Sequence, residues 1–92
     1  MTKTQMKIRE TIQEIEQLLI SKNEQYGDSV MEPISIFAKG SADELIRVRI
    51  DDKLSRLVRG NDSIEEDEDV ILDLIGYLVL LLINMRDNYG TI

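Results

Sequence analysis

Residues 74–85 read LIGYLVLLLINM, and this stretch decides the fold. Its apolar side chains would cover nearly the whole circumference of a helix, and such a helix lies at the centre of a helical domain or at an interface. The unbroken apolar run from Leu78 to Ile83 is far shorter than the roughly 20 residues that a membrane-spanning helix needs. The stretch therefore predicts the central helix of an all-α protein without a membrane span.

The start of this helix is marked by the acidic run EEDED at residues 65–69. Acidic side chains in a first turn complement the positive N-terminal end of a helix. We expect the helix to begin within this run and to continue to about Arg86.

Two further helices precede it. Ser41 and Glu44 have the spacing of a capping box and predict a helix from Ala42 to about Arg59, closed by Gly60, Asn61 and Asp62. An apolar stripe predicts an earlier helix from about Met6 to Gln25, with Gly27 as the stop. Thr2 and Gln5 have the spacing of a second capping box, and Thr4 competes with Thr2 for the cap. The stripe consists of Ile8, Ile12, Ile15 and Leu19.

The connection from Asp28 to Gly40 is longer than most links between helices, and Pro33 breaks its pattern. A functional lid or binding loop and a packed surface loop are equally good interpretations. Its apolar anchors are Val30, Met31, Ile34, Ile36 and Phe37.

The chain of 92 residues makes a single domain, 1–92, with 42% hydrophobic and 32% charged residues. A monomer of this size buries only about 60 to 65% of its unfolded surface. Because the third helix also has more apolar surface than one partner face can cover, we expect a homo-oligomer in which the helices assemble into a bundle.

Composition excludes several classes of function. There is no cysteine and no histidine, so disulfides, thiolate metal sites and imidazole catalysis are ruled out, and Mg²⁺ or Mn²⁺ are the plausible metals. A net charge of −7 opposes a role in coating genomic nucleic acid. A polar N-terminal stretch without a signal-peptide pattern predicts a cytoplasmic protein.

Charged residues interrupt the apolar faces of the second and third helices. Lys53 falls inside the apolar sector of its helix, with Arg49 and Arg56 at the edge. On the third helix, Asp69 and Asp73 share one face. Gly76, Tyr77 and, one heptad on, Asn84 continue that face. A buried charge is costly unless it is paired, so either Lys53 or Arg49 is expected to pair with Asp73.

A structural explanation suffices for each residue alone: an interior ion pair, with Gly76 allowing two helices to approach. The whole set favours function, because apolar contacts at these positions would stabilise a chain of this size better.

The segments KNEQYG at 22–27, RVRIDDKLSRL at 47–57, ED at 68–69 and DLIGY at 73–77 resemble a phage and mobile-element family. That family is called nucleotide modification associated domain one and is similar to the all-α nucleotide pyrophosphatases of the MazG type. The resemblance implies a helical nucleotide pocket built from Lys22, Asn23, Tyr26, Arg49, Asp52, Lys53, Arg56, Asp69, Asp73 and Tyr77.

The chain departs from the MazG-type pattern at the metal cage. Those enzymes hold Mg²⁺ with a Glu-Glu-x-x-Glu cluster and a Glu-x-x-Asp pair. Here Glu10, Glu14 and Glu16 do not fit the cluster. Glu66 and Asp69 have the second spacing but lie in an acidic run that is more often a solvated first turn. Asp52, Asp69 and Asp73 remain as ligands for one ion.

Three functions follow. We favour binding or sequestration of a small phosphorylated or cyclic nucleotide, with phage counter-defence as the context that the resemblance implies and no required cofactor. Lys22, Arg49, Lys53 and Arg56 would neutralise phosphate, and Tyr26, Tyr77 or Phe37 would stack on a base. The alternatives are a Mg²⁺-dependent nucleoside triphosphate pyrophosphohydrolase and a helical protein–protein adaptor.

Overall fold

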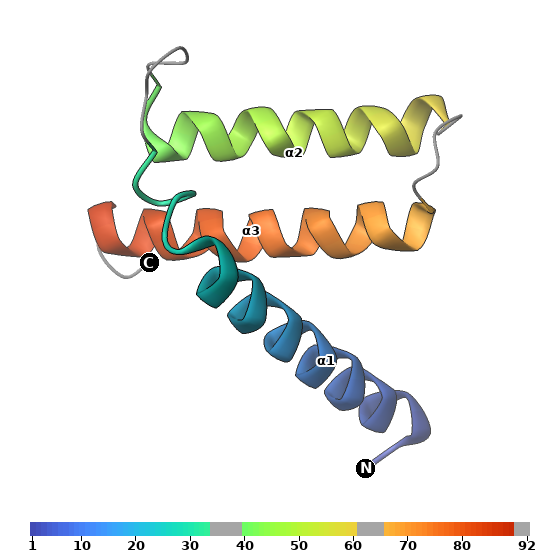
Figure 1. Ribbon diagram of the computed structural model, residues 1–92. Helices are drawn as coiled ribbons and strands as arrows, with labels where there is room; N and C mark the ends of the chain where they lie inside the picture. The colour runs from blue at the N-terminus through green and yellow to red at the C-terminus, as the bar shows by residue number, and fades with distance from the viewer. Residues whose placement is uncertain (34–39, 61–65, 90–92) are drawn as a thin grey trace.

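The computed structural model describes residues 1–33, 40–60 and 66–89, and within these residues it contains three helices and no strand. They are α1 (Lys3–Tyr26), α2 (Ala42–Arg59) and α3 (Asp67–Tyr89) (Figure 1). The all-α fold class and the number of main helices predicted from the sequence are confirmed. The predicted anchors Ile34, Ile36 and Phe37, together with Asn61, Asp62 and Glu65, lie outside the described residues.

The helix ends follow local side-chain chemistry. Thr2 Oγ1 accepts a hydrogen bond from Gln5 N at 3.1 Å, and Thr2 N donates to Gln5 Oε1 at 2.9 Å. This capping box starts α1 at Lys3, earlier than the predicted Met6. Ser41 Oγ caps α2 by accepting from Glu44 N at 3.2 Å. Gly27 and Gly60 end α1 and α2 with φ values of 66° and 81°, which favour glycine.

Helices α2 and α3 lie side by side and antiparallel, whereas α1 crosses α3 and then extends away from both (Figure 1). Gly76 lies buried at this crossing. A Cβ built on Gly76 would come within 2.8 Å of Leu19 Cδ2, so glycine permits the close approach of α1 to α3.

Burial is divided unevenly among the helices. Ile46 on α2 and Val70 on α3 are almost fully buried, and so is one polar side chain among the described residues, that of Asn84 on α3. In contrast, α1 contains no buried residue, and its predicted core stripe is largely uncovered, with Ile12 58% exposed. The stripe therefore has the apolar pattern of a core-facing helix surface, but within one copy of the chain nothing packs over most of it.

The dimensions of the chain reflect the projecting α1. The Cα radius of gyration is 15.0 Å, compared with about 12 Å for a compact domain of this length. The accessible surface is 7408 Å², whereas a compact monomer of this mass would expose about 5,500 Å². Across the described ranges, none of the helices combines the length and apolar character that a bilayer span requires.

Candidate functional site

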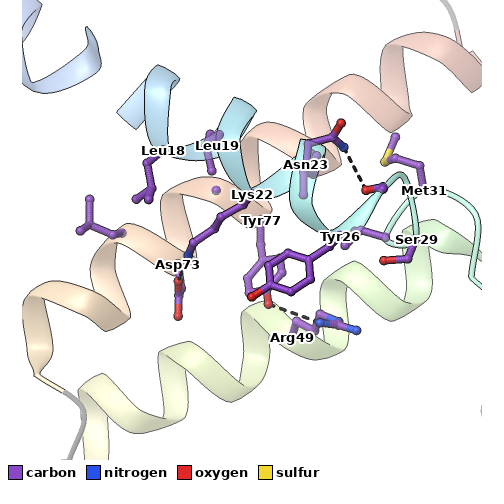
Figure 2. A pocket seen from close by; sticks show the side chains of 15 residues that line it. Leu18, Leu19, Lys22, Asn23, Tyr26, Ser29, Met31, Arg49, Asp73 and Tyr77 are labelled. Carbon is purple, nitrogen blue, oxygen red and sulfur yellow. Dashed lines mark hydrogen bonds and ion pairs between the residues drawn. The ribbon is translucent and has the colours of Figure 1, made fainter. Parts of the chain in front are cut away.

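A hollow of about 440 Å³ lies where the C-terminal end of α1, the turn after it, α2 and α3 meet. This volume falls within the range of sites for small molecules. Leucines, Val30 and Met31 supply apolar walls, and seven polar side chains are distributed around them. These polar residues are Lys22, Asn23, Tyr26, Ser29, Arg49, Asp73 and Tyr77 (Figure 2).

The carboxylate of Asp73 lies between two lysines. Lys53 Nζ is 3.0 Å from Oδ2, and Lys22 Nζ is 3.3 Å from Oδ1. The side chain of Asp73 is 26% exposed, that of Lys53 only 12%, and that of Lys22 47%. The predicted pairing of Lys53 with Asp73 is therefore found, while Lys22, from a helix far away in the sequence, is a second partner that helix spacing did not indicate.

These contacts set the protonation of Asp73. Partial burial acts to raise the pKa of this carboxyl group, but the hydrogen bonds and positive charges of Lys53 and Lys22 outweigh it. The pKa is thus lowered from its ordinary value, and Asp73 is an anion at neutral pH. One carboxylate between two ammonium groups leaves positive charge at this end of the hollow.

Arg49 reaches Tyr77 across the hollow from α2. Its Nη1 donates to Tyr77 Oη at 3.4 Å, and its Cζ lies 5.8 Å from the centre of the ring, within cation–π range. Arg49 therefore contacts Tyr77. Of the two cations expected as a partner for Asp73, it is Lys53 and not Arg49 that forms the ion pair. Figure 2 shows the side chains of Tyr26, from α1, and Tyr77, from α3, extending into the hollow, with a dashed line joining Tyr77 to Arg49.

Asn23 shapes the rim of the hollow. Its Nδ2 donates to Gly27 O at 3.4 Å and to Asp28 Oδ1 at 3.3 Å, which fixes the turn that follows α1. That turn brings Ser29 and Met31 to the wall of the hollow (Figure 2). Neither residue was among the predicted site residues, although the connection that contains them was interpreted as a possible binding loop with Met31 as an apolar anchor.

Four of the predicted binding residues lie outside the lining of the hollow, namely Asp52, Lys53, Arg56 and Asp69. Asp52 and Arg56 form an ion pair with each other, with Nη2 3.2 Å from Oδ2. Arg56 shares a helix face with Arg49 but lies two turns further along α2, about 10 Å away. Lys53 does not line the hollow itself, but it contacts Asp73, which does.

The carboxylates considered for a metal do not converge in one chain. Among the described residues, no group of three acidic side chains is placed to hold an ion. Both oxygens of Asp73 are engaged by lysines, Asp52 is paired with Arg56, and Asp69 is exposed in the first turn of α3. The trio Asp52, Asp69 and Asp73 therefore does not form a metal site within a single copy.

Comparison with models of known protein families finds no match to this chain. Searches of curated proteins and of solved structures also find none. The family resemblance thus remains an expectation based on short motifs, and the geometry of the hollow has to support any functional conclusion.

Proposed function

We propose that the hollow binds a small phosphorylated nucleotide, with the phosphate toward Lys22 and Arg49 and the base against tyrosine. The observation that carries this proposal is the convergence of two cationic and two aromatic side chains from three helices on one hollow of about 440 Å³. Sites of this kind combine an apolar wall with a few polar groups that fix the orientation of a ligand.

The phosphate half of the proposal rests on Lys22 and Arg49. An ammonium group has three donors and a guanidinium five, and the contacts to Asp73 and Tyr77 occupy only part of each set. Both side chains are exposed enough to meet a ligand. Hydrogen bonds between such cations and phosphate are roughly twice as strong as those between neutral groups.

The base half rests on Tyr26 and Tyr77. Tyr26 is largely exposed at the rim, and Tyr77 is held by Arg49. Stacking of a base on an aromatic ring contributes about 1 to 3 kcal/mol. The rim tyrosine would close over a ligand that the cations have already positioned.

Binding without rapid turnover fits this arrangement better than hydrolysis. Cleavage of a phosphoanhydride depends on metal ions held by several converging carboxylates. Among the described residues no three acids converge in this way, and Asp73 and Asp52 form ion pairs. We therefore propose that the protein sequesters its nucleotide in the cytoplasm, as a homo-oligomer; the phage counter-defence role follows from the family resemblance alone.

The test is a melting and calorimetry screen with nucleoside mono-, di- and triphosphates and cyclic dinucleotides, each with Mg²⁺ and with EDTA. A ligand present at one hundred times its Kd should raise the stability of the folded state by about 2.7 kcal/mol. We expect at least one nucleotide to do so in EDTA. If none raises the melting temperature in either condition, the proposal is wrong.

Arg49→Gln and Arg47→Gln provide a matched pair for this screen. Both remove one arginine from an exposed position on α2, but Arg49 lines the hollow, whereas Arg47 pairs with Asp43 at 2.6 Å outside it. Arg49→Gln should weaken binding at least tenfold and Arg47→Gln by less than twofold. Release of pyrophosphate at about 1 per second or faster with Mg²⁺ would instead establish the enzyme alternative.

A further inference from the structure

A second hollow of about 820 Å³ runs between α1 and the C-terminal half of α3. Its walls are mainly aliphatic and include Ile12, Ile15, Val79 and Ile83. We call this hollow the α1–α3 groove. Ile12, Val79 and Ile83 are exposed in the single chain, so the groove is an apolar surface without a cover.

The rim of the α1–α3 groove carries charge of one sign. Among the described residues that line it, every charged side chain is acidic. They are Glu16, Glu24, Asp28, Glu32 and Asp87. An occupant must therefore present an apolar stripe together with cations, and an anionic membrane surface would be repelled.

The N-terminal half of α1 has these two properties. Residues 3–9 carry three cations, Lys3, Lys7 and Arg9, and no acid. Glu10 and Glu14 follow, which leaves residues 3–14 with a net charge of +1. Ile8 and Ile12 continue the same helix as an exposed apolar stripe. One helix thus combines a cationic apolar end with a wall of the acidic apolar groove, which makes the surface complementary to a second copy of itself.

We infer that two copies of the chain pair through this surface, each laying the N-terminal half of its α1 into the α1–α3 groove of the other. A two-fold interface of this kind uses the same patch on both copies. The two α1 helices run antiparallel, because only that direction brings Lys3 and Lys7 to the acidic end of the groove at Glu24. With Ile12 of one copy opposite Ile15 of the other, Lys3 lies opposite Glu24.

The size of the exposed surface agrees with this pairing. The chain exposes about 1,900 Å² more than a compact monomer of its mass, and a stable complex buries about 800 Å² per partner. The paired helix would also contact residues that form the wall of the first hollow, because four residues line both hollows. They are Leu19, Asn23, Met31 and Leu80. This inference does not depend on the proposed nucleotide binding.

The first experiment measures mass in solution by light scattering at micromolar concentration. The parent protein should run at about twice the chain mass of 10.6 kDa, and Ile12→Asp should run as a monomer that keeps its helical circular dichroism. Val58→Asp is the control, because Val58 is 84% exposed on α2 and lies outside the groove. A monomeric parent, or equal behaviour of the two variants, would overturn the inference.

The second experiment tests direction and uses the absence of cysteine from the sequence. Lys3→Cys and Glu24→Cys variants are oxidised separately and as a mixture, and the disulfides are identified by mass spectrometry. The antiparallel pair predicts mixed disulfides, because like positions are separated by about 30 Å along the helices. If each variant cross-links faster with itself, the helices are parallel and the proposed pairing is wrong.

Discussion

The antiparallel pair α2–α3 and the projecting helix α1 both carry apolar faces, but they differ in how much of the face is buried within one copy of the chain. In α2–α3, Ile46 and Val70 are removed from water within one copy. In α1, a stripe with the same helical period stays exposed, because only the C-terminal part of α1 lies against α3, where Leu19 meets Gly76, and the N-terminal part projects away (Figure 1). Periodicity therefore identifies a face that needs a cover, but it does not say whether the cover comes from the same chain.

The strongest test of this difference compares Ile46→Ala with Ile8→Ala. Ile46→Ala should lower the free energy of unfolding by about 2 to 5 kcal/mol at every protein concentration, because it opens a cavity within one copy. Ile8→Ala should have an effect that depends on concentration, because Ile8 is exposed in one copy and would be covered by a second copy in the proposed pair. Denaturant unfolding at two concentrations measures both.

If both variants lower the free energy of unfolding by the same amount at both protein concentrations, the proposed difference between α2–α3 and α1 is wrong. Such a result would mean that α1 packs against its own chain more closely than the structure shows.

The next effect concerns Asp73, whose carboxylate on α3 contacts Lys22 of α1 and Lys53 of α2. Asp73→Asn should destabilise the fold by about 1 to 3 kcal/mol, between the values for exposed and fully buried ion pairs, because Asp73 is 26% exposed. Lys53, whose side chain is only 12% exposed, loses its ion pair with the Asp73 carboxylate in this variant. A bound nucleotide should restore part of the loss if its phosphate reaches the same lysines.

Asp52→Asn is the control for that measurement. Its side chain is 57% exposed and pairs with Arg56 on the same helix, so its loss should cost less than about 0.5 kcal/mol. Melting curves of both variants that coincide with the parent would show that Asp73 does not couple the two regions.

The pH dependence of Asp73 gives a prediction with a definite sign. Its folded pKa lies below the ordinary value of 3.8, so the folded state binds fewer protons at this group than the unfolded state. The stability that it contributes is therefore complete above that value and is lost as pH falls through the folded pKa. The difference in melting temperature between the parent and Asp73→Asn should be constant from pH 7 to about 5 and shrink below about 4.

A difference that stays constant down to the acid limit of folding would show that the lysines do not lower this pKa. Asp52→Asn, measured over the same range, corrects for the general effect of removing one negative charge.

Local signals predicted the helices and half of the site. The caps at Thr2 and Ser41 and the glycine stops at Gly27 and Gly60 set the helix ends, and the position of Lys53 on an apolar face indicated a buried partner. These features depend on residues a few positions apart in the sequence, which explains why they can be predicted from it.

The rest of the site depends on how helices cross, which local spacing does not determine. Lys22 meets Asp73, and Ser29 and Met31 reach the hollow, only because α1 passes over α3 at Gly76. The same crossing explains why Arg56, two turns from Arg49, does not line the hollow. Whether the hollow holds a nucleotide remains a prediction that the binding screen decides.

The smallest expected effect comes from Gly76→Ala at that crossing. Alanine is favoured over glycine within a helix by about 0.8 to 1 kcal/mol, whereas crowding a packed contact costs about 1 to 3 kcal/mol. The atom that must move is Leu19 Cδ2, the end of a flexible side chain, so the cost of crowding should lie at the low end. The net loss in the free energy of unfolding should be below about 1 kcal/mol.

Leu19→Ala removes that atom, so Gly76→Ala should stabilise the Leu19→Ala background although it slightly destabilises the parent. A double-mutant cycle by denaturant unfolding measures this change of sign, with a coupling of about 0.5 kcal/mol or more expected for residues in contact. Additive effects would show that α1 does not cross α3 at Gly76, and the hollow, which depends on that crossing, would then have to be reconsidered together with it.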